Sequence, residues 1–229
     1  MSTMKTPTRT VPEPSSAEAS DVRRRIIDTA SNLFYARGVR AVGVDLVVEA
    51  SGVAKTSLYR HFPSKDALIV AFLKREDLEF WKLWDEVAAR YAGNPAAELD
   101  AHMRWIGKRL SRVNYRGCPQ INVAAEFADP DHPAREMAGQ HMQALRKRLT
   151  ELARGLGAAR PNDLAAQLCL LVNGAFVSAS FLAPDEATRV LMAAARALVG
   201  SANTRAFASG VERRTARAPT RVSRTVRQL

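Results

Sequence analysis

Cysteine is scarce in this sequence, with only Cys118 and Cys169 among 229 residues. Two widely separated cysteines do not form the disulfide framework of a small secreted protein, so we expect two reduced thiols. Long apolar runs are also missing, because no stretch reaches the ~18 consecutive apolar residues that span a bilayer. Residues 1–20 lack the apolar core of a signal peptide. These absences predict a cytoplasmic protein with no membrane partner.

Signatures of catalysis are missing as well. No Ser-His-Asp arrangement, phosphate-binding loop or metal-hydrolase motif occurs. The four histidines, which are His61, His102, His132 and His141, do not have the close spacing of metal ligands. We therefore expect no enzymatic activity, no cofactor and no bound metal.

The alternation of β-branched residues that marks strands is absent too, and helical periodicity takes its place. Apolar residues recur at helical spacing between glycine and proline breaks, which predicts an all-α fold of about nine helices. We expect an N-terminal three-helix domain followed by a larger helical domain. The predicted limits are a disordered arm at 1–19, the three-helix domain at 20–66, the larger helical domain at 67–202 and a basic tail at 203–229.

The positive charge is unevenly distributed. The chain carries a net charge of +11, and the last 27 residues hold seven basic groups and one acidic group. This tail has no apolar face to bury, so we expect it to be disordered. Two interpretations stay open: a solvated tail, or an arm attracted to DNA phosphates without regard to sequence.

Residues 44–62 have the layout of a helix-turn-helix. Two short predicted helices, 44–51 and 54–61, flank Gly52, which tolerates the positive φ that the turn needs. Val53 is expected to fill the angle between them. Leu58 and Phe62 are one helical turn apart and should face the core, which leaves polar groups on the outer face of the second helix.

The run from Gly52 to Leu68, GVAKTSLYRHFPSKDAL, resembles the TetR family of tetracycline-repressor-like regulators. The upstream segments Arg25–Ala30 and Leu33-Phe34, with Gly38, support the resemblance, which covers about 50 residues. Residues 117–133 look like those of a subgroup of these regulators. The resemblance implies a ligand-responsive repressor that binds a palindromic operator on double-stranded DNA as a homodimer. A small-molecule effector would bind in the C-terminal domain.

The resemblance also implies roles for individual residues. Tyr59 and His61 look like phosphate anchors on the recognition helix, and Lys65 like a phosphate contact at the start of the next helix. Four residues look like base or near-base contacts: Lys55, Thr56, Ser57 and Arg60. Arg60 is chemically the best suited, because a guanidinium can bond O6 and N7 of guanine together.

The chain departs from the family pattern around the second helix. Gly43 and Ala54 stand where the family commonly has Ser or Thr, and Ala is a poor helix cap that costs about 1 kcal/mol. Asp45 occupies a position that often carries DNA-facing polar or basic groups. It would either accept from N4 of cytosine or repel phosphate.

An effector pocket is expected among apolar and aromatic residues of the C-terminal half, most of which will be ordinary core. Cys118 is either a redox or electrophile sensor or, more commonly for such a residue, a small buried hydrophobe. Ligand binding would tilt the long helix that starts at Ser64 and change the half-site spacing. The candidates are Trp81, Trp84, His102, Met103, Trp105, Ile106, Cys118, Phe127, Met142 and Phe176.

The last two predicted helices, 163–182 and 185–200, are apolar on nearly every side. We expect them to form a four-helix dimer interface with a second copy, the alternative being a core within one chain. The candidates are Leu164, Leu168, Leu171, Val172, Ala175, Ala179, Leu191, Ala194 and Leu198.

The competing function is a DNA-binding protein that is indifferent to sequence and driven by the basic tail. Deletion of the tail separates the two hypotheses. A specific regulator keeps its sequence preference without the tail, whereas a tail-driven protein loses its DNA binding. Repressor or activator, the operator sequence and the identity of the effector stay open at this stage.

Overall fold

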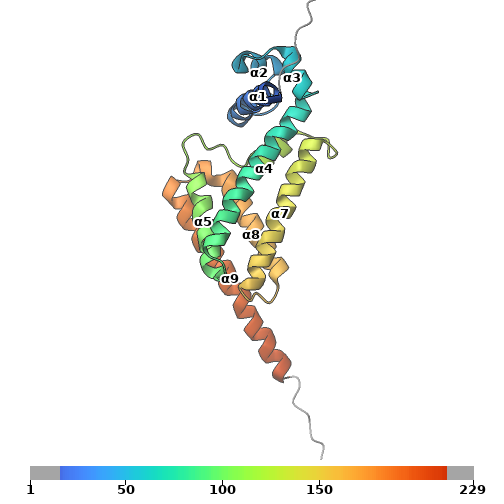
Figure 1. The fold of residues 1–229 in the computed structure, drawn as a ribbon. Coiled ribbons are helices and arrows are strands. Elements are labelled where there is room, and N and C mark those ends of the chain that lie inside the picture. Colours follow the sequence, from blue (N-terminus) through green and yellow to red (C-terminus); the bar gives the residue numbers. More distant parts are fainter. Residues whose placement is uncertain (1–15, 216–229) are drawn as a thin grey trace, which may run out of the picture. The chain divides into compact units, whose positions relative to one another are not determined.

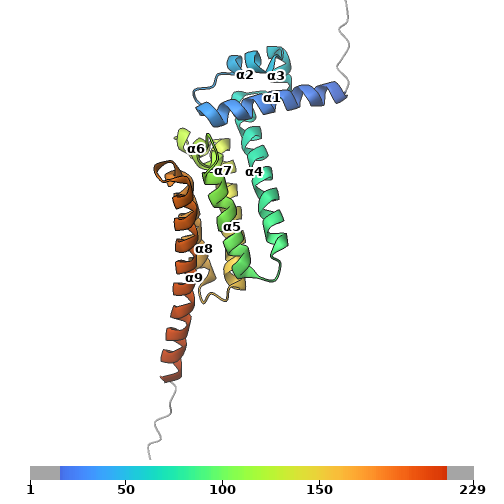
Figure 2. The same cartoon turned by 90° about the vertical axis from the view of Figure 1, so that its left-hand side faces the viewer.

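The computed structural model describes residues 16–215 of the chain, and Figures 1 and 2 show the fold from two sides. All regular structure within this range is helical, as predicted. The elements are α1 (Ser16–Arg37), α2 (Val44–Ser51), α3 (Lys55–His61), α4 (Lys65–Arg90), α5 (Pro95–Leu110), α6 (Pro119–Glu126), α7 (Pro133–Gly155), α8 (Pro161–Ser178), the 3-10 turn η1 (Ala179–Phe181) and α9 (Pro184–Thr215).

The predicted N-terminal arm, 1–19, and the predicted C-terminal tail, 203–229, lie only partly within the described residues. The helix α9 continues to Thr215, although the sequence predicts its end at about residue 200. Gly200 does not stop the helix, because it lies inside α9 and lacks the positive φ of a glycine C-cap. The remaining parts of the expected arm and tail, 1–15 and 216–229, lie outside the described residues.

Two compact units make up the described chain, and their limits differ from the predicted domain limits. Unit 1 comprises the described residues up to Asp77 together with the segment Pro119–Ala138, and unit 2 comprises Leu78–Cys118 together with the described residues from Gly139 onward. The sequence predicts a boundary at 66/67. The boundary lies later because Leu68, Ile69 and Phe72 of α4 are buried in the core of unit 1.

The core of unit 1 is built by α1, α2, α3, the first part of α4 and the segment 119–138. Leu58 is fully buried and Phe62 is 3% exposed, so both face the core as their spacing predicts. Val123 of α6 and Ala134 of α7 are buried in the same cluster. A segment that follows α5 in the sequence therefore completes the N-terminal unit.

The core of unit 2 is a helical bundle in which α9 packs along both α5 and α8 (Figure 2). The closest approach is at Gly107 of α5, where an added Cβ would lie 2.4 Å from Oγ1 of Thr188. Glycine at this position allows α5 and α9 to come together. On the surface, Arg196 of α9 bonds Asp100 of α5 through two contacts of 2.6 and 3.0 Å.

Residues 161–181 are long and apolar enough to cross a membrane by length and composition, and they are the only such helix in the described part of the chain. One face of this helix is buried in unit 2. The buried side chains are those of Leu164, Ala165, Leu168, Val172 and Phe176. Length and composition alone are weak evidence for a membrane span, because the core helix of a water-soluble protein passes the same test.

Candidate nucleic-acid interface

The helix α3 carries six of the predicted DNA-binding side chains, and Leu58 is its one buried residue. Leu58 anchors the helix to the core, and the polar residues lie on its accessible surface. Lys55, Thr56 and Arg60 are exposed, whereas Ser57 and His61 are half-buried. Tyr59 is 42% exposed.

The turn between α2 and α3 has the conformation that the sequence predicts. Gly52 adopts φ 64° and ψ 27°, and its N–H donates to the carbonyl oxygens of Val48 and Glu49. Val53 is buried beneath the turn at 9% exposure. Neither Gly43 nor Ala54 forms a side-chain cap, so the two departures from the family pattern leave the starts of α2 and α3 without side-chain capping.

Arg25 of α1 forms hydrogen bonds with the turn between α2 and α3. Its Nη2 atom donates to the carbonyl oxygens of Ser51 at 3.0 Å and Gly52 at 3.2 Å. These carbonyl groups lie at the C-terminal end of α2, where cations are favourable. Arg25 lies in the family-like segment, but sequence reasoning gave it no role because its partners are 26 and 27 residues away.

Asp45 has a partner within the chain. Its Oδ1 atom lies 2.7 Å from Nζ of Lys55, so the first cation of α3 is paired with the second residue of α2. The hydrogen bond to Asp45 and the charge of Asp45 raise the pKa of Lys55. Sequence reasoning considered only DNA as the partner of Asp45 and missed this pair.

The start of α4 offers a further polar surface on unit 1. Ser64 caps the helix, as predicted, because its Oγ accepts from the N–H of Ala67 at 3.0 Å. Lys65 is the first residue of α4 and is half-buried. Free N–H groups at a helix start favour an anion, and the nearby ammonium adds to that preference.

Unit 2 contains an aromatic cluster that includes four of the predicted effector residues. The rings of Trp84 and His102 are stacked with centroids 3.7 Å apart. Trp81 and Trp105 both contact Trp84, at 6.0 and 6.3 Å. Phe80 joins the cluster through contacts to all three tryptophans.

Sequence reasoning missed Phe80 and His141 as members of this cluster. His141 of α7 lies 5.0 Å from the rings of both Phe80 and Trp81. The spacing of Phe80 and Trp84, one helical turn apart on α4, was a usable signal for the first residue. The position of His141 depends on how α7 packs and carries no such signal.

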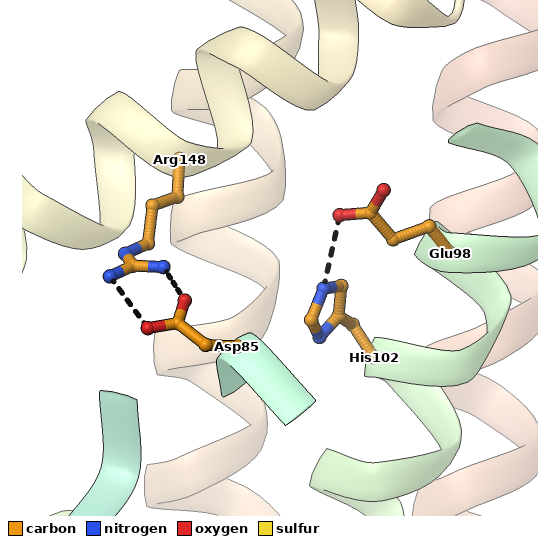
Figure 3. A network of polar contacts seen from close by, with 4 residues as sticks. All are labelled: Asp85, Glu98, His102 and Arg148. Carbon is orange, nitrogen blue, oxygen red and sulfur yellow. Dashed lines mark hydrogen bonds and ion pairs between the residues drawn. The ribbon is translucent and has the colours of Figure 1, made fainter. Parts of the chain in front are cut away.

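Polar side chains contact two members of the cluster. Figure 3 shows two pairs, one formed by Asp85 of α4 with Arg148 of α7 and the other by Glu98 with His102, both of α5. Arg148 donates to both carboxylate oxygens of Asp85 and places its guanidinium 4.5 Å from the ring centroid of Trp81. Oε1 of Glu98 lies 3.4 Å from Nε2 of His102.

His102 is fully buried, and neither of its ring nitrogens has a hydrogen-bond partner among the described residues. Burial, with a smaller contribution from the charge of Arg148, lowers the pKa of His102 to about 4. Burial also raises the pKa of the Glu98 carboxyl group. At neutral pH the imidazole is therefore uncharged, and its contact with Glu98 is not an ion pair.

The other predicted effector residues are distributed over both units. Met103 and Ile106 are fully buried on α5, and Phe176 is buried on α8. Sδ of Met142 accepts from Nδ2 of Asn173 at 3.4 Å. Phe127 belongs to unit 1, where its ring stacks on His132 at 3.7 Å, so it is separate from the aromatic cluster of unit 2.

Neither cysteine is in a disulfide bond. Cys118 is 8% exposed, which favours the small buried hydrophobe over the sensor. Cys169 is half-buried, and burial raises the pKa of its thiol. Within the described part of the chain, no three His, Cys, Asp or Glu side chains are close enough to hold a metal ion.

The residues predicted for the dimer interface fall into two groups. Leu171, Ala175, Ala194 and Leu198 are half-buried. The other five form part of the core of a single chain, because α8 and α9 pack on each other and on α5. These buried residues are Leu164, Leu168, Val172, Ala179 and Leu191.

The accessible apolar surface of α8, η1 and α9 lies beside the buried residues. Leu170 is 74% exposed and Phe181 is 85% exposed. The sequence does not distinguish the faces of α8, because apolar residues occur on every side of it. The exposed large apolar residues of these elements are Leu170, Val177, Phe181, Leu182 and Val190.

A family model and several curated proteins are similar to the N-terminal part of this chain. A family model described as bacterial regulatory proteins, tetR family, matches residues 26–72, which span α1 to α4. The transcriptional regulator AcrR of Shigella flexneri is 29% identical over 82 residues, which cover 36% of this chain and 38% of that protein. The transcriptional repressor KstR2 of Rhodococcus jostii is 35% identical over 79 residues, covering 34% and 35% of the two chains.

The curated relatives are matched over 24–62% of their own lengths. A solved structure extends the similarity to most of the fold. SCO4454, a TetR-family transcriptional regulator from Streptomyces coelicolor, has a TM-score of 0.77 and 27% identity, and the match covers 80% of this chain and 96% of that one. With the sequence motif, the helix-turn-helix of unit 1 and the helical unit 2, these matches show that residues 26–72 are similar to the bacterial regulatory proteins of the tetR family, and that most of the described fold is similar to that of a TetR-family transcriptional regulator.

Proposed function

We propose that the protein is a cytoplasmic transcriptional repressor that binds a palindromic operator as a homodimer and is released by a small, mostly apolar effector. The observation that carries the proposal is the accessible face of α3. Lys55, Tyr59 and Arg60 are exposed on a helix that Leu58 holds to the core. This is the arrangement of a recognition helix that enters the major groove.

Within this proposal, phosphate contacts fix the position of the protein and base contacts give specificity. Tyr59, His61 and Lys65 anchor the phosphate backbone. Lys55, Thr56, Ser57 and Arg60 face the bases, with Arg60 as the first candidate for a bidentate contact to guanine. Asp45 affects DNA binding indirectly, because its carboxylate is paired with the ammonium of Lys55.

The dimer interface in this proposal is the exposed apolar face of α8, η1 and α9. Leu170 and Val177 are seven residues apart on α8 and share one side of that helix, and the exposed Phe181 follows in η1. Burial against the same face of a second copy removes these side chains from water and forms a four-helix interface with two-fold symmetry.

The effector site in this proposal is the aromatic cluster of unit 2. Phe80, Trp81, Trp84 and Trp105 supply apolar surface, and His102 supplies an uncharged polar group without a protein partner. Pockets of this kind bind mostly apolar ligands and fix their orientation through a few polar contacts. No catalytic role is inferred, and the curated relatives described above are named as regulators.

The proposal is tested by salt-dependent binding to a 30-base-pair duplex of random sequence. The double variant Arg60→Ala/Lys65→Ala removes two cations from the proposed interface. Lys82→Ala/Arg90→Ala removes two exposed cations from the second half of α4 and is the matched control. In a random duplex no guanine is fixed opposite Arg60, so both cations neutralise phosphate there. Their loss makes the slope of log K against log salt shallower by about 1.8, and the control leaves the slope unchanged.

Equal slopes for the two double variants would contradict the proposal and favour tail-driven binding. A variant that ends at Thr215 tests that alternative directly. It keeps its preference for a selected site over random DNA if α3 reads the sequence, and it loses DNA binding altogether if the tail is the DNA-binding element.

A further inference from the structure

We infer that Glu126, at the end of α6, is a positioning residue for DNA recognition that fixes the connection between α1 and α2. This inference rests on the proposed function. Glu126 lies more than 80 residues beyond α1 in the sequence, yet its side chain is bonded to the backbone immediately after that helix. The family-like residues at 26–72 do not include it.

The carboxylate of Glu126 binds two consecutive backbone N–H groups. Oε1 accepts from Val39 at 3.1 Å, and Oε2 accepts from Arg40 at 2.8 Å. Gly38 precedes them with φ 85°, and this conformation turns the next two N–H groups toward one point. Such a concave arrangement of N–H groups is an anion-binding nest, and here the anion is the side chain of Glu126.

Gly38 fits this arrangement closely. A Cβ at this position would lie 3.0 Å from Oε1 of Glu126, in addition to the strain of a positive φ. The positive φ at residue 38 and the short distance to the Glu126 carboxylate therefore both favour glycine at this position.

The segment that carries Glu126 is fixed at several points within unit 1. Gln120 is 2% exposed, and its Nε2 donates to the carbonyl oxygen of Leu73 at 2.9 Å. Val123 is buried in the core. Nη1 of Arg135 donates to the carbonyl oxygen of Phe127 at 3.0 Å. Glu126 thus extends from a rigid support, and its carboxylate has a defined position.

A cation–π contact also joins the segment after α1 to the segment after α6. The guanidinium of Arg40 lies 5.7 Å from the ring centroid of Phe127, and that ring also stacks on His132. The connection that follows α1 is therefore held by the carboxylate of Glu126 and by the ring of the next residue.

Residues 38–43, which Glu126 binds, connect α1 to α2. The conformation of this segment therefore sets the position of α2 and α3 relative to α1. Arg25 fastens the other end of α2, at the turn before α3. Loss of the Glu126 contacts leaves the hydrogen bonds of Arg25 in place. Unit 1 therefore stays folded, while the positions of α2 and α3 become less well defined. Base contacts require a more accurate position than phosphate contacts, so the preference for a specific site falls first.

The test uses the full-length protein with Glu126→Ala and Glu126→Gln. Asp131→Ala is the matched control, because Asp131 is an exposed carboxylate of the same segment. Three quantities are measured for each protein: amide hydrogen exchange at residues 39 and 40, affinity for a site selected from random DNA, and affinity for a random duplex.

Glu126→Ala is expected to accelerate exchange at Val39 and Arg40 about 10-fold, because local opening exposes both amides. Affinity for the selected site falls about 10-fold and affinity for random DNA less than about 2-fold. Glu126→Gln keeps one acceptor oxygen and gives intermediate values, which also keeps the test decisive if the alanine variant does not fold. Asp131→Ala behaves as the wild type.

Faster exchange with an unchanged preference for the selected site overturns the inference. An equal loss of affinity for both duplexes, together with a lower Tm, also overturns it by showing a structural role alone. If the wild type itself prefers no sequence, the proposed function fails and this inference falls with it. That failure is distinguishable because it occurs in the unaltered protein.

Discussion

Nζ of Lys55 lies 2.7 Å from Oδ1 of Asp45, so an acidic residue of α2 is paired with the first cation of α3. Both side chains are exposed, at 54% for Lys55 and 81% for Asp45, and the pair is accessible to solvent and salt. A pair of this kind contributes little to folding. Its effect is expected on DNA binding, because the same ammonium cannot bond fully to both a carboxylate and a phosphate.

Asp45→Asn should therefore strengthen binding to random DNA and reduce discrimination between sites. The freed ammonium gains a phosphate contact, which makes the slope of log K against log salt steeper by about 0.9. Fluorescence anisotropy over a range of salt concentrations measures this slope. Glu49→Gln removes an exposed charge from the same helix and is the control. The same change of slope in both variants would show that net charge, and not the pair, is responsible.

Gly107→Ala should destabilise unit 2. The new Cβ would lie 2.4 Å from Oγ1 and 2.8 Å from Cβ of Thr188, so α5 and α9 must separate. Overpacking of this kind costs about 1–3 kcal/mol of the free energy of unfolding. Urea unfolding followed by circular dichroism measures the loss.

The control for this variant is Gly139→Ala in α7, where nothing lies within 4 Å of an added Cβ. That change should stabilise the protein by about 0.5–1 kcal/mol through helix propensity. Thr188→Ala should recover part of the stability of Gly107→Ala. Equal effects of the two glycine substitutions would show that α5 and α9 are not in close contact at Gly107.

His102 predicts a loss of stability in acid. Its pKa of about 4 in the folded protein lies below the value of about 6.5 expected when unfolded, so folding favours the neutral imidazole. The stabilisation is fully present above pH 6.5 and is lost as the pH falls toward 4. The whole effect is about 3 kcal/mol. The raised pKa of Glu98 acts in the opposite direction, so a variant must isolate the histidine.

His102→Phe keeps an aromatic ring against Trp84 and removes the titrating nitrogens. Because neither nitrogen has a hydrogen-bond partner in the described structure, the apolar ring should be tolerated at neutral pH. Unfolding free energies of the variant between pH 4 and 7 should vary less than those of the wild type. An unchanged pH dependence would show that His102 is not the responsible group.

Leu170→Glu should dissociate the proposed dimer. Leu170 is 74% exposed on α8, and a carboxylate there would be buried without a partner in a dimer interface. Sedimentation velocity at micromolar concentration should show a dimer for the wild type and a monomer for the variant. Leu78→Glu, at a 71% exposed position of α4, should remain dimeric. A monomeric wild type would rule out this interface at that concentration.

Local sequence patterns predicted the helices of unit 1 and the side chains that face its core. The glycine turn at Gly52 and the spacing of Leu58 and Phe62 depend on neighbouring residues, and the structure confirms both. Glu126 could not be assigned in this way. Its partners Val39 and Arg40 lie 87 and 86 residues away and contribute only backbone N–H groups, which any residue other than proline supplies.

The face of α8 was not predictable for a different reason. Leu168 is fully buried and Leu170 is 74% exposed, although their side chains are identical. Periodicity identifies a buried face only when the opposite face is polar, and α8 has apolar residues on both. The placement of Phe127 in unit 1 likewise depends on long-range packing, which local patterns do not encode.

The central claim, that α2 and α3 recognise a specific DNA sequence in a symmetric dimer, is tested most directly by selecting bound fragments from random duplex DNA with the full-length protein. The predicted result is an inverted repeat whose half-sites are about one helical turn apart, ~34–36 Å between centres or a multiple of it. Enrichment of an asymmetric motif would contradict the symmetric dimer. The absence of any enriched motif would contradict sequence-specific recognition itself.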